Sequence, residues 1–324
     1  MSIAEYEYAV EQCDVPAVRR NALQEYRNFR RRCLVYLRGE ADSSVMNQIH
    51  GLAWHTAVFR TLNEARRLEP ERAVNGALWE LVSAGYANLM TLGVRRLVDR
   101  HPQTDSVWNV LVHIEKHPEL LRRENLVCYD GLPYDPQAAF EKSIPEGGIV
   151  SGQPRWIPTQ GPEAWGTSQL LHQSFDALAG FPQRRRRLDK VQPAMIAALK
   201  ARLEHESIRA VCALADRVVA HAERIAAESG ALPAVTYNVI DEAMKNIVQI
   251  ASFLSAQFFH DAALGSVVPV PQFDILEALD QPWVQTEHLS ELHEYWHSQS
   301  QTMEGWADSA TDEFLPPRPT TKGG

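Results

Sequence analysis

Apolar residues recur at the three- and four-residue spacing of α-helices along most of this chain of 324 residues. One such stripe consists of Val45, Ile49, Leu52, Phe59 and Leu62. A second stripe, with the spacing of a helix that packs in a bundle, consists of Ile240, Ala243, Ile247, Ile250, Leu254 and Phe258. We find no series of segments in which apolar and polar residues alternate, as strands would require. The sequence therefore predicts an all-α fold, a helical bundle of about seven or eight helices.

Another helix is predicted after Pro70, because proline in the first turn of a helix loses no hydrogen bond. Between Leu78 and Val98 the apolar residues lie almost all round this helix, which predicts that it is central and buried. An interior glycine costs a helix about 1 kcal/mol. We therefore expect Gly85 and Gly93 to let a neighbouring helix approach closely.

Glycine and proline are dense between residues 126 and 167, where the helical spacing stops. Trp156 and Trp165 lie in this stretch, so we expect it to pack against the rest of the protein. The predicted organisation is N-terminal helices in residues 1–125, an irregular insertion in 126–167, a helical hairpin region in 168–265, a linker and C-terminal helix in 266–310, and a disordered tail in 311–324.

The formal net charge of -9 and the pI near 5.8 argue against a general nucleic-acid coat protein and leave room for a local basic site. Cys13, Cys33, Cys128 and Cys212 stand far apart, so we expect reduced thiols. The first residues contain no apolar signal segment, and no run of the sequence is long enough to cross a bilayer. These features predict a cytoplasmic protein with no membrane partner.

Two arginine clusters are predicted to be solvated helix faces. The first consists of Arg27, Arg30, Arg31 and Arg32, and the second runs from Arg184 to Arg187. Four consecutive arginines can bind phosphate, yet on one helical turn they point in different directions.

The segment LADRVVAHAERI carries a candidate site. At about 100° per residue, an α-helix places Arg217, His221, Arg224 and Glu228 along one shoulder of a stripe formed by Ile208, Val211, Ala215, Val218, Ala222 and Ile225. A histidine flanked by two arginines can serve as a base beside a bound phosphate. The alternative is a histidine at the edge of a charged surface.

This segment resembles the signature helix of the HEPN superfamily, in which an Ala-His pair follows a polar residue. The stretches VMNQIHGLAWHTAVFRTLNEARRL and NGALWELVSAGYANLMTLGVRRLVDRHPQTDSVWNVLVHIEKH are similar to a branch of U-type abortive-infection proteins that confer phage resistance. The resemblance covers about residues 40–260. It implies a role in phage defence or a toxin–antitoxin system, with RNA, a second copy or another protein as partner.

The resemblance also implies a reaction. In the family's ribonucleases a histidine acts as acid and base on the ribose 2′-OH, and an arginine holds the phosphate, with four to six residues between the two. No metal or other cofactor takes part, and the site is shared across a dimer. His221 matches the histidine and Asp216 the polar partner, with Arg217 and Arg224 as the phosphate ligands. The family arginine falls on Ala215, a departure that favours the alternative of a catalytically silent module for dimerisation or partner binding.

A third hypothesis comes from the H-E-x-x-H motif His293-Glu294-Tyr295-Trp296-His297. On a helix, His293 and His297 could bind Zn²⁺ while Glu294 acts as the base of a metallopeptidase. No third ligand is evident from the sequence, although Glu304 and Asp308 lie two to three turns away. We therefore predict no metal site and rank the peptidase last.

Overall fold

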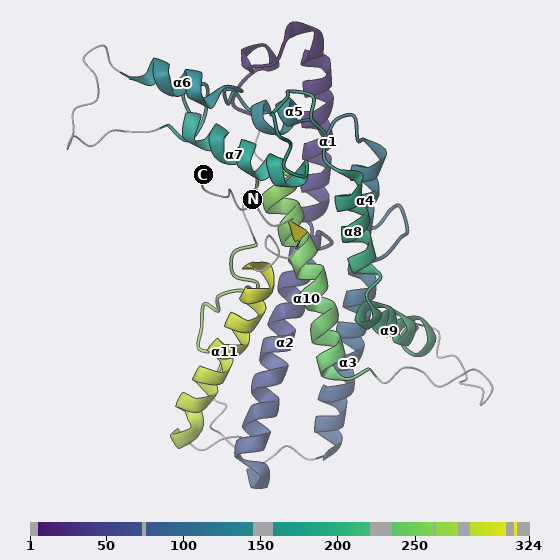
Figure 1. Cartoon of the computed structure of the whole chain (residues 1–324). Coiled ribbons are helices and arrows are strands. Elements are labelled where there is room, and N and C mark those ends of the chain that lie inside the picture. The colour runs from purple at the N-terminus through teal and green to yellow at the C-terminus, as the bar shows by residue number, and fades with distance from the viewer. Residues whose placement is uncertain are drawn as a thin grey trace, which may run out of the picture.

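The computed structural model describes residues 6–72, 76–144, 158–220, 235–261, 264–277, 286–308 and 314–315. These residues form eleven α-helices and contain no strand, in an elongated arrangement (Figure 1). The predicted all-α fold is confirmed. The helices number more than seven or eight because short ones lie in stretches where the sequence shows no long stripe. Their bounds are α1 Arg20–Arg38, α2 Val45–Leu68, α3 Gly76–Leu97, α4 Val107–Lys116, α5 Arg123–Cys128, α6 Pro136–Ser143, α7 Trp165–Leu178, α8 Pro193–Leu203, α9 Glu206–Leu214, α10 Tyr237–Phe253 and α11 Leu289–Asp308.

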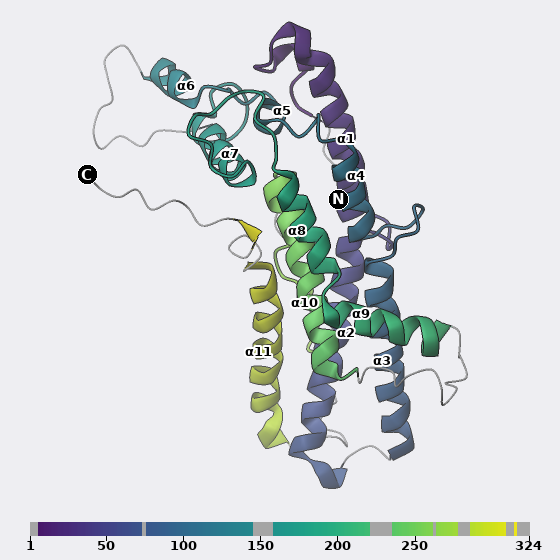
Figure 2. The same cartoon turned by 45° about the vertical axis from the view of Figure 1, so that its right-hand side comes forward.

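Four long helices form the lower half of the molecule, where α2 packs against α3, α10 and α11 (Figures 1 and 2). Both predicted stripes face this core, except that Leu62 at the end of the first is only half-buried. Every residue of the α10 stripe is buried, including Leu254 and Phe258 in the π-helical turn η5 (Leu254–Phe258) that follows α10. A helix that presents one continuous apolar face is stabilised mainly by packing of this kind.

Helix α3 is not buried on all sides, so that prediction was wrong. Leu81 is 68% exposed, and Leu89 and Leu92 are each 39% exposed, on the side turned away from α2 and α10. The two glycines also differ. A Cβ atom on Gly93 would lie 2.4 Å from Cδ2 of Leu52 in α2, which confirms a close approach there, whereas a Cβ on Gly85 would meet nothing within 4 Å.

The first arginine cluster is not a solvated face, because two of its members are buried. Arg27 donates to the carbonyl oxygens of Tyr129 and Tyr8 at 2.7 and 2.8 Å, and Arg30 donates to that of Phe259 at 2.8 Å. Free carbonyl groups in the neighbouring segments thus find guanidinium donors inside the protein. These two arginines join α1 to segments remote in the sequence.

The second arginine cluster lies in a loop between α7 and α8 and forms ion pairs. Arg185 contacts Asp176 at 2.7 Å, and Arg187 contacts Asp14 at 2.8 Å. Nearby, the fully buried Arg123 of α5 lies 2.7 Å from Asp176. Arg184, Arg185 and Arg186 are exposed, as the sequence predicted, but the cluster lies in a loop and not on a helix, and Arg187 is half-buried.

Helix α6 interrupts the stretch that was expected to be an irregular insertion. Asp135 caps it by accepting the N–H of Ala138 at 3.0 Å, and Pro136 occupies its first turn. Trp165 opens α7 and meets the ring of Phe140 edge-on, with 4.9 Å between ring centres. Trp156 lies outside the described residues. Every helix in the described parts of the chain is too short or too polar to span a bilayer.

Candidate functional site

The predicted site begins where α9 ends. Helix α9 packs against α3 and α10 and continues into the π-helical turn η4 (Ala215–Ala220). Ile208, Val211 and Ala215 are buried, as the predicted stripe requires, while Asp216 and Arg217 are exposed. A π-helix pairs residues five apart, so the α-helical angle assumed for Arg217 changes here.

His221 and Arg224 lie outside the described residues, as does Glu228. The structure therefore places two of the predicted site residues, Asp216 and Arg217, on η4. The fully buried side of this turn is occupied by Ala215, the position of the family arginine. An arginine side chain there would enter the helix-packed interior, and so this position cannot present a cation at the surface.

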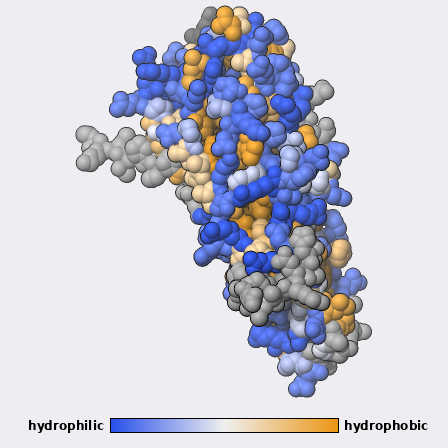
Figure 3. All heavy atoms as spheres, turned by 90° about the vertical axis from the view of Figure 1, so that its right-hand side faces the viewer, coloured by the Kyte–Doolittle hydropathy of each residue, from blue (hydrophilic) through white to orange (hydrophobic). Residues whose placement is uncertain are grey.

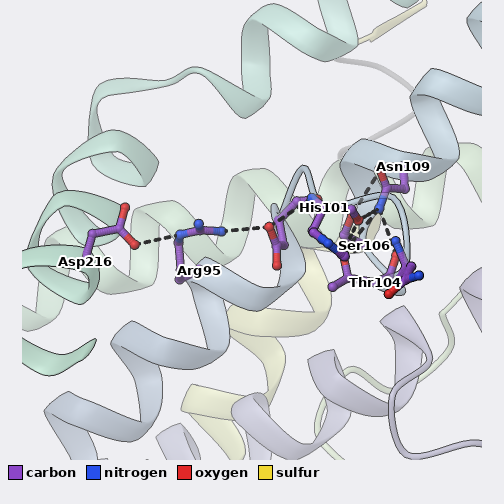
Figure 4. A network of polar contacts seen from close by, with 8 residues as sticks. Arg95, His101, Thr104, Ser106, Asn109 and Asp216 are labelled. Carbon is purple, nitrogen blue, oxygen red and sulfur yellow. Dashed lines mark hydrogen bonds and ion pairs between the residues drawn. The ribbon is translucent and has the colours of Figure 1, made fainter. Parts of the chain in front are cut away.

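A guanidinium from another helix reaches the turn instead (Figure 4). Arg95, near the end of α3, donates from Nε to Oδ1 of Asp216 at 2.9 Å, and its Nη1 lies 3.1 Å from Oδ1 of Asp99. Partial burial opposes the charge on Arg95, but the bonds to the two carboxylates outweigh it and raise the pKa of this side chain. Arg95 is therefore a cation held in place next to Asp216.

The loop that follows α3 holds Asp99 in place through hydrogen bonds. The backbone N–H of His101 donates to Oδ1 of Asp99 at 3.1 Å, and the hydroxyl of Ser106 donates to the Asp99 carbonyl at 2.6 Å. Asn109, which is buried, donates to the carbonyls of His101 and Thr104 at 2.6 and 2.9 Å. Burial would raise the pKa of Asp99, but the hydrogen bond from His101 and the bonds from Arg95 lower it overall. The carboxylate that orients Arg95 therefore stays ionised.

A cavity of about 220 Å³ lies beside the ion pair, between the end of α3, α4, and the α8–α9 connection. Its wall carries three arginines, two carboxylates and one aromatic ring: Arg95, Arg100, Arg209, Glu204, Asp216 and Trp108. Arg100 forms an ion pair with Glu204 and lies over the Trp108 ring, 4.1 Å from the ring centre. The cavity is therefore lined by more cations than anions.

Arg209 has no ion-pair or hydrogen-bond partner for its side chain among the described residues, and it is exposed. The thiol of Cys212 also lines the cavity, and burial raises its pKa to about 11. It is therefore protonated near neutral pH, which makes it a poor nucleophile. The chemistry available at this place is the binding of an anion by guanidinium groups.

The H-E-x-x-H motif lies on α11, at the far side of the bundle from this cavity (Figure 2). The Nδ1 atom of His293 contacts the Leu289 carbonyl of its own helix at 2.9 Å, and its Nε2 lies 3.4 Å from Asp274. Glu294 and His297 are exposed. Within the described residues, no three metal-ligating side chains come together here or elsewhere.

The described residues define an all-α helical bundle in which the turn with Asp216 and Arg217 follows α9. Residues 37–279 match the HEPN AbiU2 family, so the chain belongs to this family of abortive-infection proteins. Comparison with curated proteins finds no match, and neither does comparison with solved structures. The family match covers the same helices as the resemblance seen in the sequence and extends it at both ends.

The sequence did not reveal Arg95, Arg100 or Arg209 as members of a common site. Arg95 lies 121 residues before its partner Asp216, and no spacing rule connects them. The one available signal was the basic segment VRRLVDRH at the end of the predicted helix. Positive charge there is also expected without any binding site, because cations at a helix C-terminus interact favourably with the helix dipole. The packing of α9 against α3 brings these residues together.

Proposed function

We propose that this protein cleaves RNA without a metal ion, with His221 as the acid and base. The observation that carries the proposal is the Arg95–Asp216 contact at 2.9 Å. It supplies an arginine at the turn that precedes His221, although the family position, Ala215, is buried and carries no charge. Membership of the HEPN AbiU2 family supports the same reaction.

In the proposed reaction, the His221 imidazole removes the proton of a ribose 2′-OH. The 2′ oxygen attacks the adjacent phosphorus, a 2′-O–P bond forms, and the P–O bond to the 5′ oxygen of the next nucleotide breaks. A protonated imidazole returns a proton to that leaving oxygen. Proton transfer of this kind contributes typically about 10²–10⁴-fold to a rate. Arg217 and Arg224 are the proposed phosphate ligands on the same segment, and Arg95 adds a third from α3.

The test is the cleavage of labelled total RNA and tRNA by the purified protein in EDTA, beside the variant His221→Ala. We expect cutting by the wild type that survives chelation and a loss of at least about 100-fold in the variant. Intact RNA with both proteins at micromolar concentration would refute the proposal. Cutting that EDTA abolishes would refute the metal-free mechanism.

The role of Arg95 has its own test, which uses the family spacing. Arg95→Gln removes the guanidinium from α3, and we expect cleavage to fall by about 100-fold, the cost of losing one stabilising donor. Adding Asp216→Arg to this variant returns a guanidinium to the turn, four intervening residues before His221. Partial recovery in the double variant is the expected result. Full activity of Arg95→Gln alone would show that Arg95 holds no phosphate.

We propose a second function, self-association, from the exposed leucines of α3. Leu81, Leu89 and Leu92 follow one another on a single side of the helix, with Gly85 between them. Gly85 weakens the helix by about 1 kcal/mol, yet no atom within 4 Å of its Cβ position explains its presence in the monomer. A second α3 crossing at Gly85 would use the missing side chain and cover the leucines of both copies. Such a patch is self-complementary, as a two-fold dimer requires.

Figure 3 shows the side of the molecule that is on the right in Figure 1, where hydrophobic side chains reach the surface in separate patches surrounded by hydrophilic ones.

The test of the dimer is the molar mass by light scattering, for the wild type and for Leu81→Glu. The matched control is Leu170→Glu on α7, where the leucine is 64% exposed against 68% for Leu81. We expect a dimer that only Leu81→Glu dissociates. A monomeric wild type would refute it.

A further inference from the structure

We propose that the cavity of about 220 Å³ between α3, α4 and α9 is a subsite for a backbone phosphate of single-stranded RNA. Its ligands are Arg100 and Arg209, together with Arg95, which lies between this phosphate and the one that is cut and contacts both. The choice of RNA rests on the proposed function, because the cavity adjoins the turn with Asp216 and Arg217. The phosphate bound here belongs to a nucleotide next to the one that is cut.

All three guanidinium groups at the cavity are available to an incoming anion. Arg209 has no partner for its side chain within the described residues. Arg95 and Arg100 are paired with Asp216 and Glu204, whose side chains are 52% and 43% exposed. Exposed ion pairs contribute little, since water and salt compete with them. A backbone phosphate, whose single negative charge is shared by two oxygens, can therefore displace these carboxylates and accept bidentate bonds from arginine.

Arg95 is oriented before any ligand binds. Its Nη1 group contacts Asp99 at 3.1 Å, and Asp99 is held by the loop that Asn109 ties together. If Asp216 releases Arg95, the contact with Asp99 remains and keeps the guanidinium at the cavity. A donor fixed in this way loses less entropy when it binds an anion.

The cavity does not offer a platform for a base. Trp108 could stack on one, but Arg100 lies over its ring at 4.1 Å and Lys200 at 5.4 Å from the ring centre. The ring therefore holds cations in position. The volume is also smaller than the roughly 300–1,000 Å³ of sites that enclose a drug-sized molecule. A phosphate group with its sugar fits these features, so we infer a contact that is independent of base sequence.

The experiment measures binding of a fluorescent, fully 2′-O-methylated oligoribonucleotide by anisotropy across a range of salt. This probe lacks the attacking hydroxyl, so binding is measured without cleavage. The cavity variants are Arg209→Gln and Arg100→Gln. The matched control is Arg67→Gln at the end of α2, an arginine 62% exposed and ion-paired, against 61% for Arg100.

We expect each cavity variant to bind about 5- to 10-fold more weakly near 0.1 M salt, and the slope of log K against log salt to become shallower by about 0.7 for each phosphate that the variant no longer neutralises. Arg67→Gln should match the wild type in both measurements. Unchanged far-UV circular dichroism and melting temperature will show that the variants are folded.

Equal affinity and equal slope for the cavity variants and the wild type would overturn the subsite, and so would absence of wild-type binding. The binding measurement tests the subsite independently of the proposed nuclease activity. A wild type that binds the methylated probe through Arg209 and Arg100, yet leaves unmodified RNA intact, supports the subsite and refutes the nuclease. Cleavage that continues in variants with unchanged binding refutes the subsite alone.

Discussion

The two glycines of α3 provide a comparison in which the same substitution, in the same helix, should have opposite effects on stability. Alanine at either position gains about 1 kcal/mol from helix propensity. At Gly85 the new Cβ meets nothing within 4 Å, so Gly85→Ala should raise the free energy of unfolding by about 0.5–1 kcal/mol. This gain is expected for the monomer, where α3 has no partner at that position among the described residues.

At Gly93 the new Cβ would lie 2.4 and 2.7 Å from the two Cδ atoms of Leu52. Leu52 is buried between α2 and α3, so it must move or push the helices apart. Overpacking of a core costs about 1–3 kcal/mol. The gain of about 1 kcal/mol in helix propensity offsets part of this cost, so Gly93→Ala should lower the free energy of unfolding by up to about 2 kcal/mol. The two variants should therefore differ by about 1–3 kcal/mol.

Urea unfolding followed by far-UV circular dichroism measures the difference, at a protein concentration where light scattering finds only monomer. Leu52→Val added to Gly93→Ala removes one methylene next to the collision and should recover part of the loss. If Gly85→Ala and Gly93→Ala shift the midpoint equally and in the same direction, the contact with Leu52 does not determine the stability of this helix pair.

Three further results are expected. Arg123→Ala should lower the free energy of unfolding by about 3 kcal/mol, measured by urea unfolding, because Asp189 loses its guanidinium partner and Asp176 keeps only Arg185. A loss under about 1 kcal/mol would contradict this. Burial lowers the pKa of His172 to about 4. The stability that the neutral imidazole contributes to the folded protein is therefore complete above pH 6.5 and is lost as the pH falls towards 4. In this range the free energy of unfolding should fall by up to about 1.4 kcal/mol per pH unit, and His172→Gln should make this pH dependence weaker. Cys212, whose pKa burial raises to about 11, should react with iodoacetamide at neutral pH far more slowly than free cysteine.

The sequence was informative wherever the physical cause is local. The stripes of α2 and α10 predicted both the helices and their buried faces, because side chains three and four residues apart share one side of a helix. The order of these degenerate segments also pointed to the family that residues 37–279 match. The count of helices was too low, since α5 and α6 are too short to show a period.

The same local rules failed where a side chain finds its partner far along the chain. Arg27 and Arg30 have the pattern of solvated residues, yet both are buried and donate to carbonyl oxygens remote in the sequence. Helix α3 looks buried on all sides because leucine is apolar wherever it points. Which of its faces the bundle covers depends on the number and placement of neighbouring helices, and that is not a property of α3.

The candidate site divides in the same way. The helical class and the family could be predicted from the sequence, and so could the candidate segment with Asp216, Arg217 and His221, because each depends on residues close together along the chain. The contact of Arg95 with Asp216, and the cavity that Arg100 and Arg209 share with them, appear only in the folded protein. The reason is physical: hydrogen bonding and helical spacing act within a few residues. The crossing of α9 over α3 is fixed by packing of buried faces, and it joins residues 121 positions apart.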